Sequence, residues 1–215
     1  MLSLPTATLR ICADGAANAI FDAFREEGFQ DEPVEGAVDF PSPEVTRLLP
    51  PNEIVGDLDS VRDAVKDYFE KRGTRVVHRP SQYATDLQKS IQRLEDVEAE
   101  QASKGDLVIF GGLSGRFDQT THTLHVMWQL AKGVPDLKGV EDPEDGVRGG
   151  TLLKRSRTWV VNEASVTWLL PPGKHDLQMS RRVLGKTCGI LPLGVGPQND
   201  GAHVTTKGLK WNLGE

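Results

Sequence analysis

Aspartate occurs wherever an apolar run gives way to an amphipathic one in the first 120 residues. The positions are Asp14, Asp57, Asp59, Asp86 and Asp118. In a parallel α/β sheet these junctions share one edge, so we expect the five carboxylates to converge in space. Carboxylates that lie close together repel one another unless a cation is bound among them. The pattern therefore predicts Mg²⁺ and, through it, a phosphate-bearing substrate.

Most of these aspartates also fit a purely structural role. Thr85 and Gln88 have the spacing of a helix capping box, and Ser60 with Asp63 resembles one. Asp14 precedes a glycine and also suits a plain turn. Taken singly, each of these structural interpretations is at least as good as the functional one.

The segment Gly56–Ser60 is the one that capping explains least well. Capping needs one carboxylate for each helix, whereas this segment supplies two, Asp57 and Asp59, behind one strand. Gly56 also lets the backbone approach a ligand closely. Asp57 and Asp59 therefore carry most of the metal prediction.

A glycine-rich loop at residues 111–120, GGLSGRFDQT, gives a second signal. Gly111, Gly112 and Gly115 remove side chains where a strand meets a helix, so backbone N–H groups there can surround a phosphate. Arg116 adds a cation with a forked set of donors. The alternative is a flexible turn with a surface arginine, and the segment lacks the GxxxxGK[ST] pattern.

Strands and helices must alternate to position these groups. Apolar runs predict strands at residues 9–13, 53–57, 75–78 and 106–112, and the last of these, being the most apolar, is expected to be central. Helical spacing of apolar residues predicts helices near 17–24, 61–73, 87–97 and 117–131. This order predicts an α/β fold with a parallel, Rossmann-like sheet.

The pattern changes after residue 133. We expect an α/β domain at 1–135, a polar linker at 136–150 and an antiparallel β domain, either a sandwich or a barrel, at 151–215. Residues 28–52 are rich in proline and acid and predict a loop. Beyond the linker the apolar runs are short and rich in β-formers, which is typical of an antiparallel β domain.

The composition of the 215 residues is that of a soluble globular protein, with 38% hydrophobic and 26% charged residues. A net charge of −6 argues against nucleic acid or an anionic membrane as the main partner. We expect a cytoplasmic protein whose two cysteines, Cys12 and Cys188, are buried thiols. His122 and His125 have no metal-site partner motif and are expected to be packing or surface residues.

Five short segments occur in the order found in thiamine pyrophosphokinases. They are Asp14–Asn18, Gly56–Ser60, Thr85–Asp86 with Lys89, Gly115–Gln119 and Gly208–Trp211. The chain resembles this family over nearly its whole length apart from two acidic loops. The Gln-Thr pair after Asp118 resembles its eukaryotic, fungal-like branch.

The resemblance implies a reaction and a set of partners. Members of the family transfer the pyrophosphoryl group of ATP to the hydroxyethyl oxygen of thiamine, which gives thiamine diphosphate and AMP, and they need Mg²⁺. They have an α/β domain that binds ATP and Mg²⁺, which here would be residues 1–135. A β-sandwich domain follows it, which here would be residues 151–215. Members form homodimers, here expected through the β domain, with thiamine at the subunit interface.

The resemblance also assigns roles by position. The metal ligands would be Asp14, Asp57, Asp59 and Asp86. The catalytic residues would be Asp57, Asp59, Asp86 and Arg116. The residues that contact ATP, its metal or thiamine would be Asp14, Gly15, Asn18, Ser60, Thr85, Lys89, Gly111, Gly112, Gly115, Asp118, Gln119 and Trp211. Trp211 would pack on the cationic thiazolium. Either Asp86 or Asp59 would accept the hydroxyl proton.

The chain also departs from the family. Tyr83 stands where the family has an aspartate two positions before Thr85, which removes one acidic contribution. By comparison with the family we expect both domains to be shortened at the chain ends. Two alternatives follow: a fragment that binds thiamine or nucleotide without turnover, and a Mg²⁺-dependent phosphohydrolase.

Overall fold

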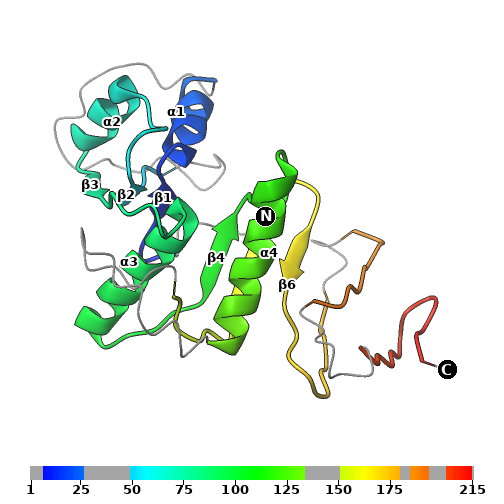
Figure 1. Ribbon diagram of the computed structural model, residues 1–215. Coiled ribbons are helices and arrows are strands. Elements are labelled where there is room, and N and C mark those ends of the chain that lie inside the picture. Colours follow the sequence, from blue (N-terminus) through cyan, green and yellow to red (C-terminus); the bar gives the residue numbers. More distant parts are fainter. Residues whose placement is uncertain (1–6, 27–48, 134–150, 180–184, 194–201, 215) are drawn as a thin grey trace. The chain divides into compact units, whose positions relative to one another are not determined.

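The computed structural model describes residues 7–26, 49–133, 151–179, 185–193 and 202–214 (Figure 1). The chain divides into two compact units, Met1–Trp168 and Leu169–Glu215. The linker predicted at 136–150 and most of the loop predicted at 28–52 lie outside the described residues. None of the helices in the described ranges is long and apolar enough to cross a membrane.

Strands and helices alternate in the first unit as the sequence predicts. The strands are β1 (Ile11–Ala13), β2 (Glu53–Gly56), β3 (Arg75–His78), β4 (Leu107–Phe110), β5 (Thr158–Val161) and β6 (Val166–Trp168). The helices are α1 (Ala16–Glu26), α2 (Asp63–Glu70), α3 (Asp86–Gln101) and α4 (Phe117–Lys132). The α/β class is therefore confirmed.

The first three strands form a parallel sheet in the order β1-β2-β3. Ala13 is paired with Val55, and Gly56 with His78, so the carboxyl ends of all three strands lie at one edge. α1 and α2 contact each other and pack on this sheet through Phe24, Val65 and Phe69. Their packing fixes the loops that follow β1 and β2.

A second sheet has the order β4-β5-β6, with β4 parallel to β5 and β5 antiparallel to β6. The prediction that β4 is a central strand is wrong: it lies at an edge of this sheet, and Val108 and Phe110 are 40% and 52% exposed. Ile109, between them, is buried. A run of four apolar residues cannot reveal whether one face or both faces of a strand are covered.

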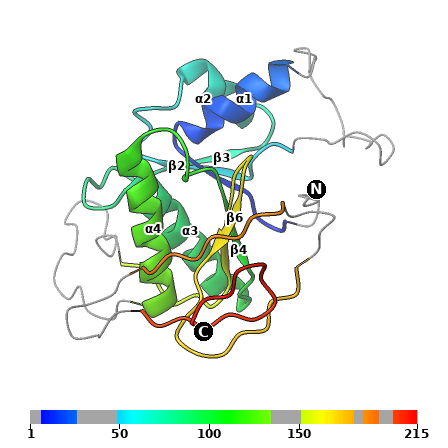
Figure 2. The same cartoon turned by 90° about the vertical axis from the view of Figure 1, so that its right-hand side faces the viewer.

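The buried face of α3 is largely polar. Its buried residues are Gln88, Lys89, Ser90, Ile91, Gln92 and Glu95, whereas Leu87 and Leu94 are only partly buried. α3 contacts β1 and β2, and Figure 2 shows it beside α4. Gln88 donates to Gln129 of α4, with 3.1 Å between Nε2 and Oε1. The helix therefore connects the first sheet to the elements around the second.

Arg155 forms a buried ion pair with Glu98 near the end of α3. Its guanidinium donates to both carboxylate oxygens of Glu98, and to the carbonyl oxygen of Gly105 at 2.7 Å. Burial acts to raise the pKa of Glu98, but hydrogen bonds from Arg155 and from the Gly105 amide lower it below the usual 4.5. The carboxylate is therefore stabilised in its charged form.

We expect Glu98→Gln to lower the free energy of unfolding by roughly 3 kcal/mol at pH 7, because it leaves Arg155 buried without its partner. A carboxyl group whose pKa is lower in the folded than in the unfolded protein stabilises the fold at pH values above its unfolded pKa. This stabilisation is lost as the pH falls through the folded pKa. The difference in the free energy of unfolding between variant and wild type should therefore reach its full value above pH 4.5 and disappear as the pH falls below it. Urea titrations at several pH values measure this difference. The exposed pair Arg157–Asp106 offers a control, since Asp106→Asn should cost at most about 1 kcal/mol.

The second unit has no strand among its described residues, 169–179, 185–193 and 202–214. The strands expected near 174–179, 187–194 and 203–208 are therefore not seen in those ranges. The predicted strands near 157–170 are β5 and β6, which belong to the first unit. Cys12 is buried as predicted, and burial raises the pKa of its thiol to about 12, whereas Cys188 is exposed, contrary to prediction.

Candidate functional site

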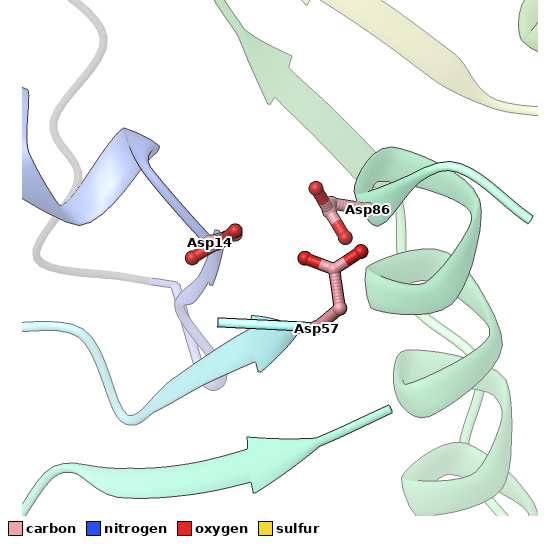
Figure 3. Close-up of side chains that lie close together, drawn as sticks. All are labelled: Asp14, Asp57 and Asp86. Carbon is pink, nitrogen blue, oxygen red and sulfur yellow. The ribbon is translucent and has the colours of Figure 1, made fainter. Parts of the chain in front are cut away.

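Asp14, Asp57 and Asp86 converge at the carboxyl edge of the first sheet (Figure 3). One carboxylate oxygen from each residue lies within 4.8 Å of the others. Asp14 follows β1, Asp57 follows β2, and Asp86 is the first residue of α3. Parallel pairing of β1 with β2 brings the first two together, and the packing of α3 on these strands supplies the third.

Asp14 is a fully buried carboxylate held by backbone amides. Its Oδ2 accepts from the N–H of Ser60 at 3.1 Å, and its Oδ1 accepts from the N–H of Val61 at 2.9 Å. Burial raises the pKa of Asp14, and the charges of Asp86 and Asp57 add to this, while the two amides oppose it. A cation placed among the three carboxylates would therefore favour the ionised form of Asp14.

Lys89 supplies a positive charge beside the cluster. Its side chain is 1% exposed, and its Nζ lies 3.2 Å from Oδ2 of Asp57 and 3.0 Å from Oδ1 of Asp86. Burial acts to raise the pKa of Asp57, but hydrogen bonds from Gln82 and Lys89 lower it overall. Asp57 is therefore held as a carboxylate.

The donor set suits a hard divalent cation. Three carboxylates and one ammonium leave two negative charges, which one Mg²⁺ would neutralise. Mg²⁺ takes one or two carboxylates and completes its shell with water and substrate phosphates. Asp57 and Asp86 are partly exposed, so such ligands would approach from their side, whereas Asp14 is buried.

Gly56 makes space for this cluster. A Cβ added there would lie 2.6 Å from the Cβ of Asp14 and 3.0 Å from Oδ1 of Asp86. We expect Gly56→Ala to cost about 1–3 kcal/mol of stability through overpacking and to spread the three carboxylates apart. Chemical denaturation should show the loss, and Gly105→Ala is the matched control, because a Cβ at Gly105 meets nothing within 4 Å. Equal, small effects in both variants would contradict the tight fit at Gly56.

Asp59 lies outside the group of three carboxylates. Its Oδ1 accepts from the Ser60 hydroxyl at 2.8 Å, and its backbone N–H points at Oδ1 of Asp57, 3.4 Å away. Asn18 binds the same loop from α1, since it donates to the carbonyl of Ser60 at 2.9 Å and accepts from the N–H of Arg62 at 3.0 Å. These contacts hold the loop that carries Asp57.

Gly15 also lies against this loop, since a Cβ there would be 3.0 Å from the Cβ of Ser60. The capping box expected at Ser60 and Asp63 is not formed: α2 begins at Asp63 after Arg62, which makes no side-chain cap. Ser60 instead gives its backbone N–H to Asp14, so the loop is organised by the carboxylate cluster and not by the helix end.

The start of α3 has the capping box that the sequence predicts at Thr85 and Gln88. Thr85 also contacts His122 of α4, with 2.7 Å between Oγ1 and Nε2. Burial lowers the pKa of His122, and the nearby His125 adds to this. Sequence reasoning missed this contact, because no sequence motif links the two residues and 37 positions separate them.

Gln82 and Tyr83 lie just before α3. Gln82 was also missed as a site residue, although its Nε2 donates to Oδ2 of Asp57 at 3.1 Å. Tyr83, which stands where the resemblance leads us to expect an aspartate, is exposed. The segment thus supports Asp57 through an amide instead of adding a further carboxylate.

The glycine-rich loop precedes α4 and follows β4. Gly111, Gly112 and Gly115 have φ angles of 83°, 78° and 79°, a region that disfavours other residues. A Cβ at Gly112 would lie 2.8 Å from Oγ1 of Thr123, whereas Gly111 and Gly115 face open space. Glycine adopts this backbone conformation without strain, and at these three positions no side chain covers the backbone of the loop.

Arg116 and Asp118 form an exposed ion pair in this loop. Nε and Nη2 of Arg116 lie 3.0 and 2.5 Å from the two carboxylate oxygens of Asp118. The pair lowers the pKa of Asp118 and raises that of Arg116. The structure thus brings together three of the five predicted aspartates, and Asp118 pairs with an arginine instead. Gln119 is exposed, and its backbone carbonyl accepts from Thr123 at 3.0 Å.

Trp211 lies in the second unit and is 77% exposed. The Nζ of Lys210 stands 4.5 Å from the centroid of its indole ring, so the ring already attracts a cation. An exposed tryptophan of this kind can accept a ligand without any rearrangement of a core.

Comparisons with known proteins identify relatives over most of the chain. Residues 2–136 match the family model described as thiamin pyrophosphokinase, catalytic domain, and residues 174–215 match the corresponding vitamin B1 binding domain. Thiamine pyrophosphokinase 3 of Oryza sativa subsp. japonica is 32% identical over 211 residues, which cover 96% of this chain and 65% of that protein. Thiamine pyrophosphokinase of Saccharomyces cerevisiae is 24% identical over 246 residues, which cover 95% and 66%.

The chain thus spans about 65% of the length of the rice relative. Among solved structures, thiamin pyrophosphokinase from Candida albicans has a TM-score of 0.46 at 18% identity, covering 74% of this chain and 52% of that one. This structural likeness is too low to support an inference about function.

Proposed function

The chain belongs to the thiamine pyrophosphokinase family, and on that premise we propose that it transfers the pyrophosphoryl group of ATP to thiamine, giving thiamine diphosphate and AMP. The observation that carries this proposal is the group of Asp14, Asp57 and Asp86 beside the buried Lys89. Such a group suits a divalent cation, and the reaction needs one to hold the polyphosphate of ATP.

We assign the metal to the three carboxylates. Bound Mg²⁺ would supply positive charge to the phosphates of ATP. Asp57 is the strongest ligand, because Gln82 and Lys89 hold it ionised and oriented. Asp14 closes the buried side, and Lys89 stands close enough to Asp57 and Asp86 to contact a phosphate that approaches them. Asp59 keeps its predicted part as a further acidic ligand or proton acceptor, alongside Asp86.

The remaining predicted residues have two kinds of role in this proposal. Asn18, Ser60 and Gly15 hold the loop that carries Asp57, and Thr85 fixes the start of α3. The glycine-rich loop with Arg116, Asp118 and Gln119 would contact the nucleotide. Asp118 keeps the guanidinium of Arg116 oriented, so the Arg116 side chain loses little conformational entropy when it binds an anion.

The second unit would bind thiamine. Its residues 174–215 match the vitamin B1 binding domain, which supports a thiamine-binding role for this unit. A β-sandwich at 151–215, a linker at 136–150, a homodimer formed through the β domain and a cytoplasmic location also remain our predictions for the protein.

We expect Trp211→Ala to raise the KM for thiamine about five- to tenfold and to leave the KM for ATP within about twofold. The loss corresponds to one cation–π contact of roughly 1 kcal/mol. Steady-state kinetics with each substrate varied in turn measures both constants, and Leu213→Ala, another exposed apolar residue of the segment, is the control. Equal effects on both KM values would assign Trp211 to structure instead of thiamine binding.

The activity is tested by incubating the chain with ATP, Mg²⁺ and thiamine and separating the products. AMP with thiamine diphosphate supports the proposal. ADP with thiamine monophosphate would make the protein a simple kinase, and ATP consumption that does not depend on thiamine would make it a phosphohydrolase. Binding of both substrates in calorimetry without any product would identify a non-catalytic member of the family.

A further inference from the structure

A surface hollow of about 200 Å³ lies at the far end of α3 from the carboxylate cluster. It is lined by residues 104–106, which follow α3, and by residues 154–157, which precede β5. Nζ of Lys104 donates to the carbonyl of Lys154 at 2.7 Å, which ties the two segments together. None of these residues takes part in the function proposed above.

The hollow carries an excess of positive charge in a chain whose net charge is −6. The ionised groups in and beside it are Lys104, Lys154, Arg155 and Arg157 as cations and Asp106 and Glu98 as anions. Positive charges therefore exceed negative ones by two. Such an excess of positive charge attracts an anion.

Arg155 provides a second and independent sign of a ligand. It is 4% exposed, lines the hollow, and uses its two Nη atoms for Glu98 and Gly105. Its Nε is buried and has no hydrogen-bond partner among the described residues. A guanidinium has five N–H donors, and the edge formed by Nε–H and the second Nη2–H is the one left over. Two donors on one edge match two oxygens of an oxyanion.

We propose that this hollow binds a phosphate-class oxyanion. Arg155 lines the hollow and has one donor without a partner, Lys154 and Lys104 add charge, and Ser156 belongs to the same lining. The orphaned donor and the excess charge both have one explanation, because a bound oxyanion satisfies the first and neutralises the second.

The volume limits the size of the ligand. A water takes about 30 Å³ of liquid, so the hollow has room for roughly six or seven waters. Pockets for drug-sized molecules begin near roughly 300 Å³. The volume therefore suits inorganic phosphate or the terminal phosphate of a nucleotide.

The test is a titration of the ¹⁵N-labelled full chain with inorganic phosphate, at constant ionic strength and with EDTA, followed by NMR. Without metal or thiamine the outcome does not depend on turnover, so it can fail while the proposed activity stands. We expect shifts confined to the amides of 104–107 and 154–158. Lys154→Gln should weaken binding about fivefold, since one unit charge at about 4 Å in water is worth about 1 kcal/mol. Lys66→Gln, which removes a charge from the partly exposed pair with Asp63, should leave it unchanged.

Two further arms separate the sources of the phosphate. ATP that shifts the same amides at lower concentration than phosphate makes the ligand a nucleotide terminus, and ATP without effect there makes it the free anion; both support the site. Arg157→Gln repeats the test of Lys154→Gln in case that variant does not fold. Equal shifts with chloride, shifts only at 111–118, or no weakening in either variant would overturn the proposal.

Discussion

Asp57→Asn is expected to lower kcat about 100-fold at saturating ATP and thiamine, the scale of losing one preorganised electrostatic group. The substitution keeps the shape of the side chain and removes the charge that Gln82 and Lys89 hold in place. It should also raise the Mg²⁺ concentration needed for half-maximal rate, because two carboxylates remain of the three. Turnover measured across a Mg²⁺ series gives both quantities.

Asp63→Asn is the matched control for this variant, since Asp63 is exposed and pairs only weakly with Lys66 on the surface. A wild-type rate in Asp57→Asn would remove the metal assignment. Asp59→Asn then discriminates between two sites: a loss as large as that of Asp57→Asn would mean that the metal is bound by the loop as well as by the three converging carboxylates.

Lys89→Met is expected to lower the stability of the metal-free protein by about 3 kcal/mol, or roughly 6–12 °C in Tm. Removing the ammonium group leaves three carboxylates together without their counter-ion. The expected loss of stability lies at the low end of the usual range because Asp86 is partly exposed. Mg²⁺ should then raise the Tm of the variant more than that of the wild type, because the metal replaces the missing charge. Thermal unfolding with Mg²⁺ and with EDTA measures both effects.

Lys66→Met controls for the loss of a lysine from the surface and should change Tm by no more than about 2 °C. Lys89→Arg tests whether charge alone is sufficient at the buried position. If Mg²⁺ stabilises the variant and the wild type equally, the cation is not bound among Asp14, Asp57 and Asp86.

Much of the first unit could be predicted from the sequence, because its signals are local. Apolar runs and helical spacing identify every strand and helix from β1 to α4, and parallel pairing explains why Asp14 meets Asp57. The capping box at Thr85 is equally local. These features depend on residues a few positions apart or on neighbouring strands.

Features that depend on distant partners could not be predicted in this way. Asp118 was expected beside the other aspartates, but β4 pairs with β5, and Arg116 binds the carboxylate two positions away. The apolar spacing of α3 suggests a core face at Leu87 and Leu94, yet the helix buries amides and charges that meet partners from other elements. The strands predicted after residue 170 were inferred from β-forming residues alone, and the sequence does not indicate which strands they would pair with.

The polar buried face of α3 has a consequence for how the site tolerates mutation. A helix packed through aliphatic side chains can slide or turn by a fraction of a residue at small cost, whereas one packed through directional hydrogen bonds has a single register. Gln88 meets Gln129, Gln92 meets the carbonyl of Thr151, and Arg93 forks onto Glu53. Together these contacts fix the register of α3 and therefore the position of Asp86 along the helix axis. Substitutions at these positions would therefore displace the Asp86 carboxylate before they cause the protein to unfold.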